Sequence, residues 1–128
     1  MTVRHLTLAE VTGLARLACG GQPPAVREPG LLASAVHRPR ARMFGVEAYG
    51  DVYERAGALL HAIAANHPLV DGNKRTAWLA AAVFLGLNGV DLRSADQDVA
   101  YALVVSVAAG DLSAPEAIGR ALARLASP

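Results

Sequence analysis

The first apolar pattern in the chain has the period of an amphipathic helix. Thr7 and Glu10 have the spacing of a capping box, in which two side chains satisfy backbone N–H groups at a helix start. Apolar residues then recur at helical spacing, at Leu8, Val11, Leu14 and Ala18. Because two glycines follow Cys19, the pattern predicts a helix that ends near residues 19–21.

Two further helices are predicted on either side of a segment without helical period. Pro29 can open a second helix, which should run to about His37 before Pro39 stops it. Residues 38–50 contain arginines and aromatic residues but no apolar repeat, so we expect a mobile flap or a short hairpin there, beside the polar residues 67–76. Residues 51–66 place apolar residues on one helical face and should form the third helix.

Three more apolar runs complete the predicted fold. Residues 73–88 are apolar nearly all round beyond their first turn, so we expect this fourth helix to be the central, buried one. Ser94 should cap a fifth helix, and Ser113 with Glu116 should open a sixth that has Pro115 in its first turn and runs to about Ala126. The prediction is a single all-α domain over residues 1–128, a compact bundle of about six helices with a central hydrophobic helix and a short flap.

Composition and charge narrow the classes of protein and partner. A chain of 128 residues forms one domain with a substantial core, and 53% hydrophobic residues with few aromatics favour closely packed Ala, Leu and Val. A formal charge of +1 gives no reason to expect a nucleic-acid or membrane partner, and lone Cys19 excludes an internal disulfide. We find no secretion signal and no apolar run of about 18 to 20 residues, so we expect a cytoplasmic protein.

Polar chemistry is concentrated in residues 67–76, HPLVDGNKRT, between two apolar stretches. Pro68 disfavours helix at the preceding His67, so the third helix should end there. Gly72 permits a positive φ and close approach by a ligand. Because the fourth helix follows directly, the backbone N–H groups of Gly72 and Asn73 should lie at the positive end of its dipole, where phosphate binds well.

The side chains of the same segment suit a phosphate site with a base beside it. Arg75 can bind phosphate oxygens in a bidentate way, and Lys74, the sole lysine of the chain, can act as a mobile point charge. Asp71 fits an anion site if it holds a Mg²⁺ ion that is shared with the phosphates. Histidine exchanges protons near neutral pH, so His67 is the candidate base. Together these residues predict transfer from a nucleotide to a hydroxyl group.

The segment resembles the Fic/Doc motif, H-x-F-x-[D/E/N]-[G/A]-N-[G/K]-R. Lys74 follows the asparagine where Fic adenylyltransferases have Gly, and Trp78 stands where they have a second Arg. Both features resemble the Doc (death-on-curing) branch, the toxin half of a toxin–antitoxin pair, whose members are short all-helical domains. Residues 28–39 are similar to the stretch before the substrate-binding flap of the family. The one departure in the motif is Leu69 in place of Phe, for which we expect slight repacking and retained chemistry.

The resemblance implies a function, a set of ligands and two partners. A Doc-like kinase would move the γ-phosphoryl group of ATP·Mg²⁺ to a Ser or Thr hydroxyl of a protein, by resemblance elongation factor Tu, and so arrest translation. His67 would be catalytic, Asp71 would bind the metal, and the cofactor-binding residues would be Gly72, Asn73, Lys74 and Arg75. No inhibitory [S/T]-x-x-x-E-[G/N] helix is present in the sequence, so the resemblance implies a separate cognate antitoxin.

Alternatives remain open for the function and for individual residues. The chain could be a Fic-type adenylyltransferase, or a catalytically silent protein that only binds an antitoxin. His67 and Asp71 have the spacing of a zinc pair, although the Pro and Gly between them argue against a continuous helix. We favour core packing over base stacking for Trp78, and a helix position over phosphate contact for Thr76. The arginines of residues 38–50 are either solvated or clamp a target polypeptide.

Overall fold

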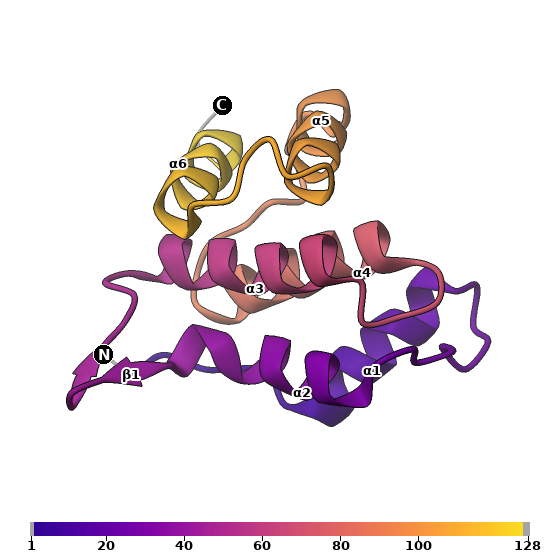
Figure 1. The fold of residues 1–128 in the computed structure, drawn as a ribbon. Helices are drawn as coiled ribbons and strands as arrows, with labels where there is room; N and C mark the ends of the chain where they lie inside the picture. The colour runs from indigo at the N-terminus through magenta and orange to yellow at the C-terminus, as the bar shows by residue number, and fades with distance from the viewer. Residues whose placement is uncertain (1, 127–128) are drawn as a thin grey trace.

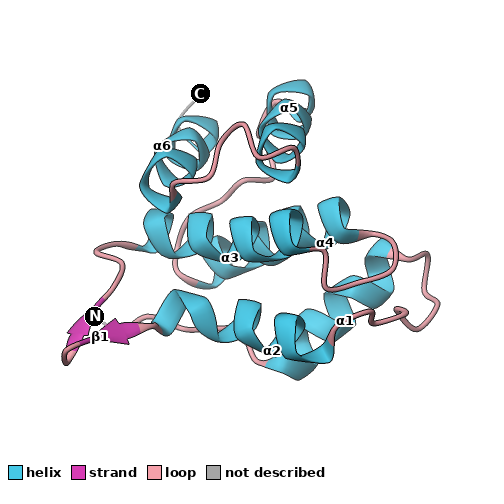
Figure 2. Ribbon diagram, viewed as in Figure 1, coloured by secondary structure: helices cyan, strands magenta, loops and turns pink. Residues whose placement is uncertain are grey.

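The computed structural model describes residues 2–126 and confirms an all-α fold with one short hairpin (Figures 1 and 2). Two short strands pair antiparallel as Arg42↔Glu47 and Met43↔Val46. The α-helices lie in three layers, with α1 and α2 in one, α3 and α4 in the middle, and α5 and α6 in the third (Figure 1). The elements are α1 (Leu8–Ala18), α2 (Pro29–His37), η1 (Arg38–Arg40), β1 (Arg42–Met43), β2 (Val46–Glu47), α3 (Val52–Asn66), α4 (Asn73–Leu87), α5 (Gln97–Ala108) and α6 (Pro115–Ala126).

α4 lies in the middle layer as expected, but the most buried helix is α3, so the expectation that α4 is the central, buried helix is wrong in its burial. All residues from Arg55 to Leu60 are buried, because α3 packs against α2, α4, α5 and α6. α4 contacts α1, α3 and α5, and its Trp78, Ala82 and Val83 remain half-exposed. The apolar sequence of α4 therefore did not lead to complete burial, because one side of the helix lines a pocket that is open to solvent.

Two glycines allow α3 and α6 to cross closely. A Cβ atom on Gly57 would overlap the carbonyl oxygen of Pro115, and one on Gly119 would lie 2.7 Å from that of Tyr53. Neither position leaves room for a methyl group, and each clash is with backbone that cannot simply rotate away. The crossing of α3 and α6 therefore depends on the absence of a side chain at both positions.

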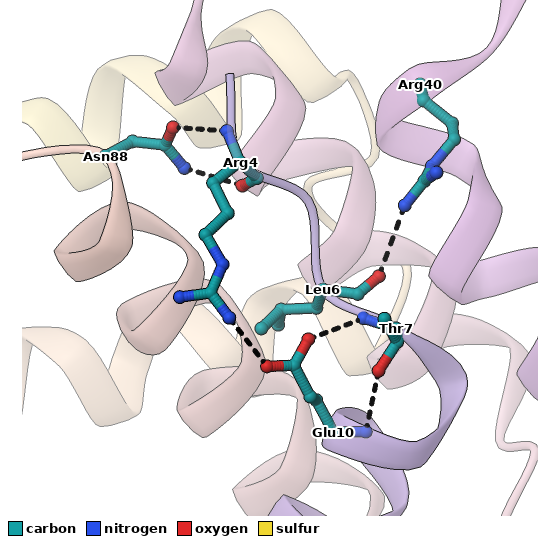
Figure 3. Close-up of polar contacts among 6 residues, drawn as sticks. All are labelled: Arg4, Leu6, Thr7, Glu10, Arg40 and Asn88. Atoms are coloured by element: carbon teal, nitrogen blue, oxygen red, sulfur yellow. Dashed lines mark hydrogen bonds and ion pairs between the residues drawn. The ribbon is translucent and has the colours of Figure 1, made fainter. Parts of the chain in front are cut away.

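The segment before α1 is held against α4 by hydrogen bonds (Figure 3). The backbone N–H of Arg4 donates to Oδ1 of Asn88 at 2.8 Å, and Nδ2 of Asn88 donates to the carbonyl of Arg4 at 2.9 Å. The predicted capping box is confirmed, with Thr7 and Glu10 each accepting from the other's backbone N–H. Asn88 thus ends α4 and fixes the start of the chain at the same time.

The fifth helix begins with a cap other than the expected one. Oδ1 of Asp96 accepts from the backbone N–H groups of Asp98 and Val99, at 2.9 and 3.1 Å. Ser94 lies too far ahead of Gln97, the first helical residue, to fill the capping position, so the expected Ser94 cap is wrong.

Within residues 2–126, the helices lack the length and apolar character needed to cross a membrane.

The hairpin predicted within residues 38–50 is confirmed, but its expected place beside residues 67–76 is wrong. Buried Arg55, in the first turns of α3, forms an ion pair with Glu47 and donates to the carbonyl of Pro39 at 3.1 Å. The hairpin is therefore held at the start of α3, whereas residues 67–76 follow its end, about 22 Å away for 15 residues. In Figure 1 the hairpin lies at the left and the loop between α3 and α4 at the right.

Arg38 connects the hairpin region to the middle of α3. Its Nε donates to the hydroxyl of Tyr49 at 3.0 Å, and its Nη1 lies 2.7 Å from Nδ1 of His61. Since Arg38 can only donate, Nδ1 of His61 must accept and the imidazole must be neutral. Burial first, and the positive charge of Arg38 second, lower the pKa of His61 below its ordinary value of 6.5.

Substitution of Gly57 by Ala should test the close helix crossing. We expect Gly57→Ala to lower the free energy of unfolding by about 1–3 kcal/mol, because the added methyl group clashes with backbone. Gly13→Ala is the matched control, since its Cβ would meet nothing within 4 Å in α1, and it should stabilise by roughly 0.5–1 kcal/mol. Urea unfolding measures both, and equal effects of the two substitutions would contradict the packing argument.

The lowered pKa of His61 should make the fold sensitive to acid. The unfolded chain binds a proton at this residue more readily than the folded chain, so stability should fall as the pH drops below 6.5. His5, whose pKa is lowered mainly by burial, should act in the same direction. Unfolding curves from about pH 5 to about pH 8 should show a smaller loss for His61→Asn, which keeps an acceptor without titrating. An unchanged pH dependence in this variant would exclude His61 as a cause.

Candidate active site

The end of α3 and the start of α4 are joined by a short loop with an unusual first residue. His67 is the C-cap of α3 and has a left-handed backbone conformation, φ 50° and ψ 59°. A non-glycine residue in this region is uncommon and needs support from its surroundings. The left-handed turn ends the helix at the predicted residue and carries the chain directly into buried Pro68.

Arg27 provides that support from outside the loop. Its guanidinium donates to the carbonyl of His67 at 2.9 and 2.6 Å and to that of Asn66 at 3.1 Å. These are carbonyl groups at the end of α3 that the helix cannot satisfy itself. Sequence reasoning missed Arg27, because its partners lie about 40 positions away and no local motif marks the contact.

Residues 25–28 run beside the loop in a strand-like pairing. Val26 and Leu69 form an isolated antiparallel bridge, and the N–H of Val70 donates to Ala25 at 2.9 Å. The N–H groups of Arg27 and Glu28 both donate to the carbonyl of Pro68. The segment between α1 and α2, and not the hairpin at residues 42–47, is therefore the neighbour of the loop.

Asn73 closes the loop from inside. Its side-chain Oδ1 accepts from the N–H of Leu69, and its Nδ2 donates to the carbonyl of Leu69, both at 2.9 Å. Leu69 is 1% exposed, so Leu fills the buried position for which the sequence suggested slight repacking. The side chain of Asn73 is thus used to hold the loop. Only its backbone N–H, in the first turn of α4, is left to bind a ligand.

The first turn of α4 exposes backbone N–H groups at a glycine. Gly72 is the N-cap, has φ 82°, and supplies no side-chain cap. The first N–H bonded within the helix is that of Thr76, which donates to the carbonyl of Gly72 at 2.9 Å. A Cβ on Gly72 would meet the sulfur of Cys19 at 3.2 Å, so both conformation and space favour glycine. This turn has the geometry of an anion site.

One pocket brings the predicted site residues together. It has a volume of about 920 Å³ and lies among the end of α1, the start of α4 and one side of α5. Lys74 and Arg75 are exposed there, and Nη1 of Arg75 lies 3.4 Å from the carbonyl of Ala18. The six predicted residues all line it, namely His67, Asp71, Gly72, Asn73, Lys74 and Arg75.

Three neighbouring residues differ in their relation to the pocket. Thr76 is fully buried and does not line it, so the alternative of a phosphate contact by its hydroxyl is contradicted. Half-buried Trp78 packs against the core, as favoured, but also lines the pocket. Cys19 is half-buried in the pocket wall.

The donor set suits Mg²⁺ better than zinc. Asp71 is exposed, and its Oδ1 accepts from the N–H of Gly72 at 2.9 Å, which leaves the second carboxylate oxygen for a cation. No group of three or more His, Cys, Asp and Glu side chains is arranged for a metal within residues 2–126. A zinc site needs such a group, whereas Mg²⁺ binds one carboxylate together with water and phosphate oxygens.

Comparison with known proteins gives the same family as the motif. The model described as the Fic/DOC family matches residues 5–85. The chain is 50% identical over 95 residues to "Toxin Doc" of Mycolicibacterium smegmatis, which covers 74% of this chain and 72% of that protein. It is 33% identical over 113 residues to "Protein kinase doc" of Escherichia phage P1, which covers 87% of each.

Both kinds of match extend well beyond the ten residues of the motif. The family model covers the chain from α1 to all but the last two residues of α4, and therefore the loop and its supports. The two relatives extend the similarity over most of the chain, with one named a toxin and the other a protein kinase. The chain belongs to the Fic/Doc family and is a homologue of both Doc proteins.

Proposed function

We propose that this protein is a Doc-type toxin kinase, which transfers the γ-phosphoryl group of ATP to a Ser or Thr hydroxyl of a protein. The observation that carries the proposal is the pocket in which His67 lies beside the positively charged first turn of α4. A candidate base and a phosphate site within one pocket are the two parts that phosphoryl transfer requires. The homologue named a protein kinase adds support from an independent comparison.

His67 is the proposed catalytic base. It takes the proton of the attacking hydroxyl while the hydroxyl oxygen bonds to the γ-phosphorus. The bond from that phosphorus to the bridging oxygen breaks, and ADP leaves with the electron pair. The bonds from Arg27 to the end of α3 hold the backbone of His67 in place, so the imidazole starts from a fixed point at the pocket edge.

The first turn of α4 is the proposed phosphate site. The backbone N–H of Asn73, with the side chains of Lys74 and Arg75, binds the phosphate oxygens, and the N–H of Gly72 joins them once it leaves Oδ1 of Asp71. Asp71 is the proposed magnesium ligand. The ion, when bound there, neutralises charge on the phosphates. Because Asn73 and Arg27 fix the loop before substrate arrives, binding requires little rearrangement.

The choice between phosphoryl and AMP transfer depends on which phosphorus faces His67. Both branches of the family use the same phosphate site, with the nucleotide turned round in the Doc branch. Lys74, and Trp78 in place of a second arginine, favour the Doc orientation. The proposed target is elongation factor Tu, the outcome is arrest of translation, and a cognate antitoxin is the proposed inhibitory partner.

Labelled nucleotide should identify the transferred group and the base. We incubate the protein with elongation factor Tu, Mg²⁺ and ATP labelled at either the α or the γ phosphorus. Only γ label should reach the target, and His67→Ala should slow its transfer by roughly 10²–10⁴-fold. His37→Ala, on the exposed end of α2, is the control and should leave transfer unchanged.

Two other results would favour the open alternatives. Transfer of α label would make the protein an adenylyltransferase despite Lys74. A silent antitoxin-binding protein would transfer neither label, and it would arrest growth equally with and without the His67→Ala substitution. Growth arrest on expression that His67→Ala abolishes therefore excludes the silent protein.

Removal of the Lys74 charge should slow transfer without changing its chemistry. We expect Lys74→Ala and Lys74→Gly to lower the rate of γ transfer by about 10-fold or more, since each removes a charged hydrogen bond to phosphate. Alanine keeps the helix propensity that glycine loses, so similar rates for the two variants assign the effect to charge. If both variants keep the original rate, Lys74 does not support the Doc assignment.

A further inference from the structure

A second pocket adjoins the proposed phosphate site along α4. It has a volume of about 590 Å³ and lies between the outer face of α4 and the turn that follows this helix. The two pockets share Trp78 and Gln97, so they meet at these side chains. The rest of its wall is formed by Ala82, Val83, Gly86, Gly89, Val90, Asp91, Leu92 and Arg93.

Trp78 lies where the two pockets meet. It lies one helical turn beyond Lys74 and therefore on the same side of α4. Part of the indole packs against the core, and the rest is accessible from both pockets. A large aromatic ring that is held by the core but left half-exposed offers a rigid face to a ligand.

The spacing along α4 matches an extended nucleotide. From Lys74 to Val83 the helix rises by about 13 Å, and Trp78 lies between the two. A triphosphate at the first turn of α4 would therefore leave its nucleoside over Trp78 and toward the second pocket. Gln97, whose Nε2 donates to the carbonyl of Ala95 at 3.2 Å, lines both pockets.

We propose that the second pocket is the nucleoside subsite of this protein, with the base stacked on Trp78. This inference rests on the proposed function, because it requires the phosphates to bind at the first turn of α4. It assigns Trp78 a positioning role, because this residue has none in the binding of the phosphates. Stacking on an aromatic ring accepts any base, so Trp78 supplies affinity, and Gln97 is placed to contact the base edge.

Binding measurements can separate the base from the phosphates. The probes are ATP and inorganic tripolyphosphate, each with Mg²⁺, which share the phosphate chain and differ in the nucleoside. Trp78→Leu should weaken ATP binding by about 10-fold and leave tripolyphosphate binding unchanged. Trp78→Phe should restore most of the ATP affinity, since it returns an aromatic face.

Intrinsic fluorescence gives a second readout on the unmodified protein. Trp78 is the sole tryptophan of the chain, so its emission reports this subsite alone. ATP should quench it by stacking, and tripolyphosphate should not. Tyr53→Leu, which removes an aromatic ring packed against the core outside both pockets, is the control and should preserve the quenching.

The outcomes distinguish this inference from the function on which it rests. If both probes bind and Trp78→Leu affects neither, or weakens both equally, the nucleoside subsite is wrong and the phosphate site stands. If neither probe binds the wild-type protein, the phosphate site fails and the subsite fails with it. A melting temperature of Trp78→Leu well above the assay temperature ensures that lost binding is not lost folding.

Discussion

The proposed site depends on how the backbone of one loop is satisfied. The carbonyls that end α3 accept hydrogen bonds from Arg27, and the backbone of Leu69 is bonded at both its N–H and its C=O by the Asn73 side chain. A loop with these groups unpaired would either move or use the N–H groups at the start of α4 for itself. Because other groups satisfy the loop, the N–H groups of residues 73–75 remain available to an anion, while that of Gly72 donates to Asp71.

The same loop is rigid because of what lies below it. Leu69 inserts into the core, and α3 is packed against α2, α4, α5 and α6, the last through the close crossing at Gly57. The packing of α3 therefore fixes the position of its C-terminal end and the direction in which α4 begins. The side chains that project from this junction can be mobile, as Lys74 is exposed, while their backbone is not.

Charge in this protein is local. The formal charge of the whole chain is +1, so long-range attraction of a nucleotide is weak. Affinity for phosphate must come from the one helix turn where two cations and free N–H groups coincide. The half-exposed apolar side of α4 continues from that turn, which places an aromatic surface next to a charged one. This combination is suited to a ligand that carries phosphate groups at one end and a planar ring at the other.

The sequence alone determined the helices, most of their ends and the composition of the site, because these follow from local patterns. The capping box at Thr7, Pro29 at the start of α2 and the ten-residue motif all act over a few residues. Tertiary structure decided which helix is central, where the hairpin lies, and that Trp78 faces a pocket. It also supplied Arg27, since contacts across 40 positions leave no local signal. Burial and long-range hydrogen bonds depend on how helices pack, which residue spacing does not specify.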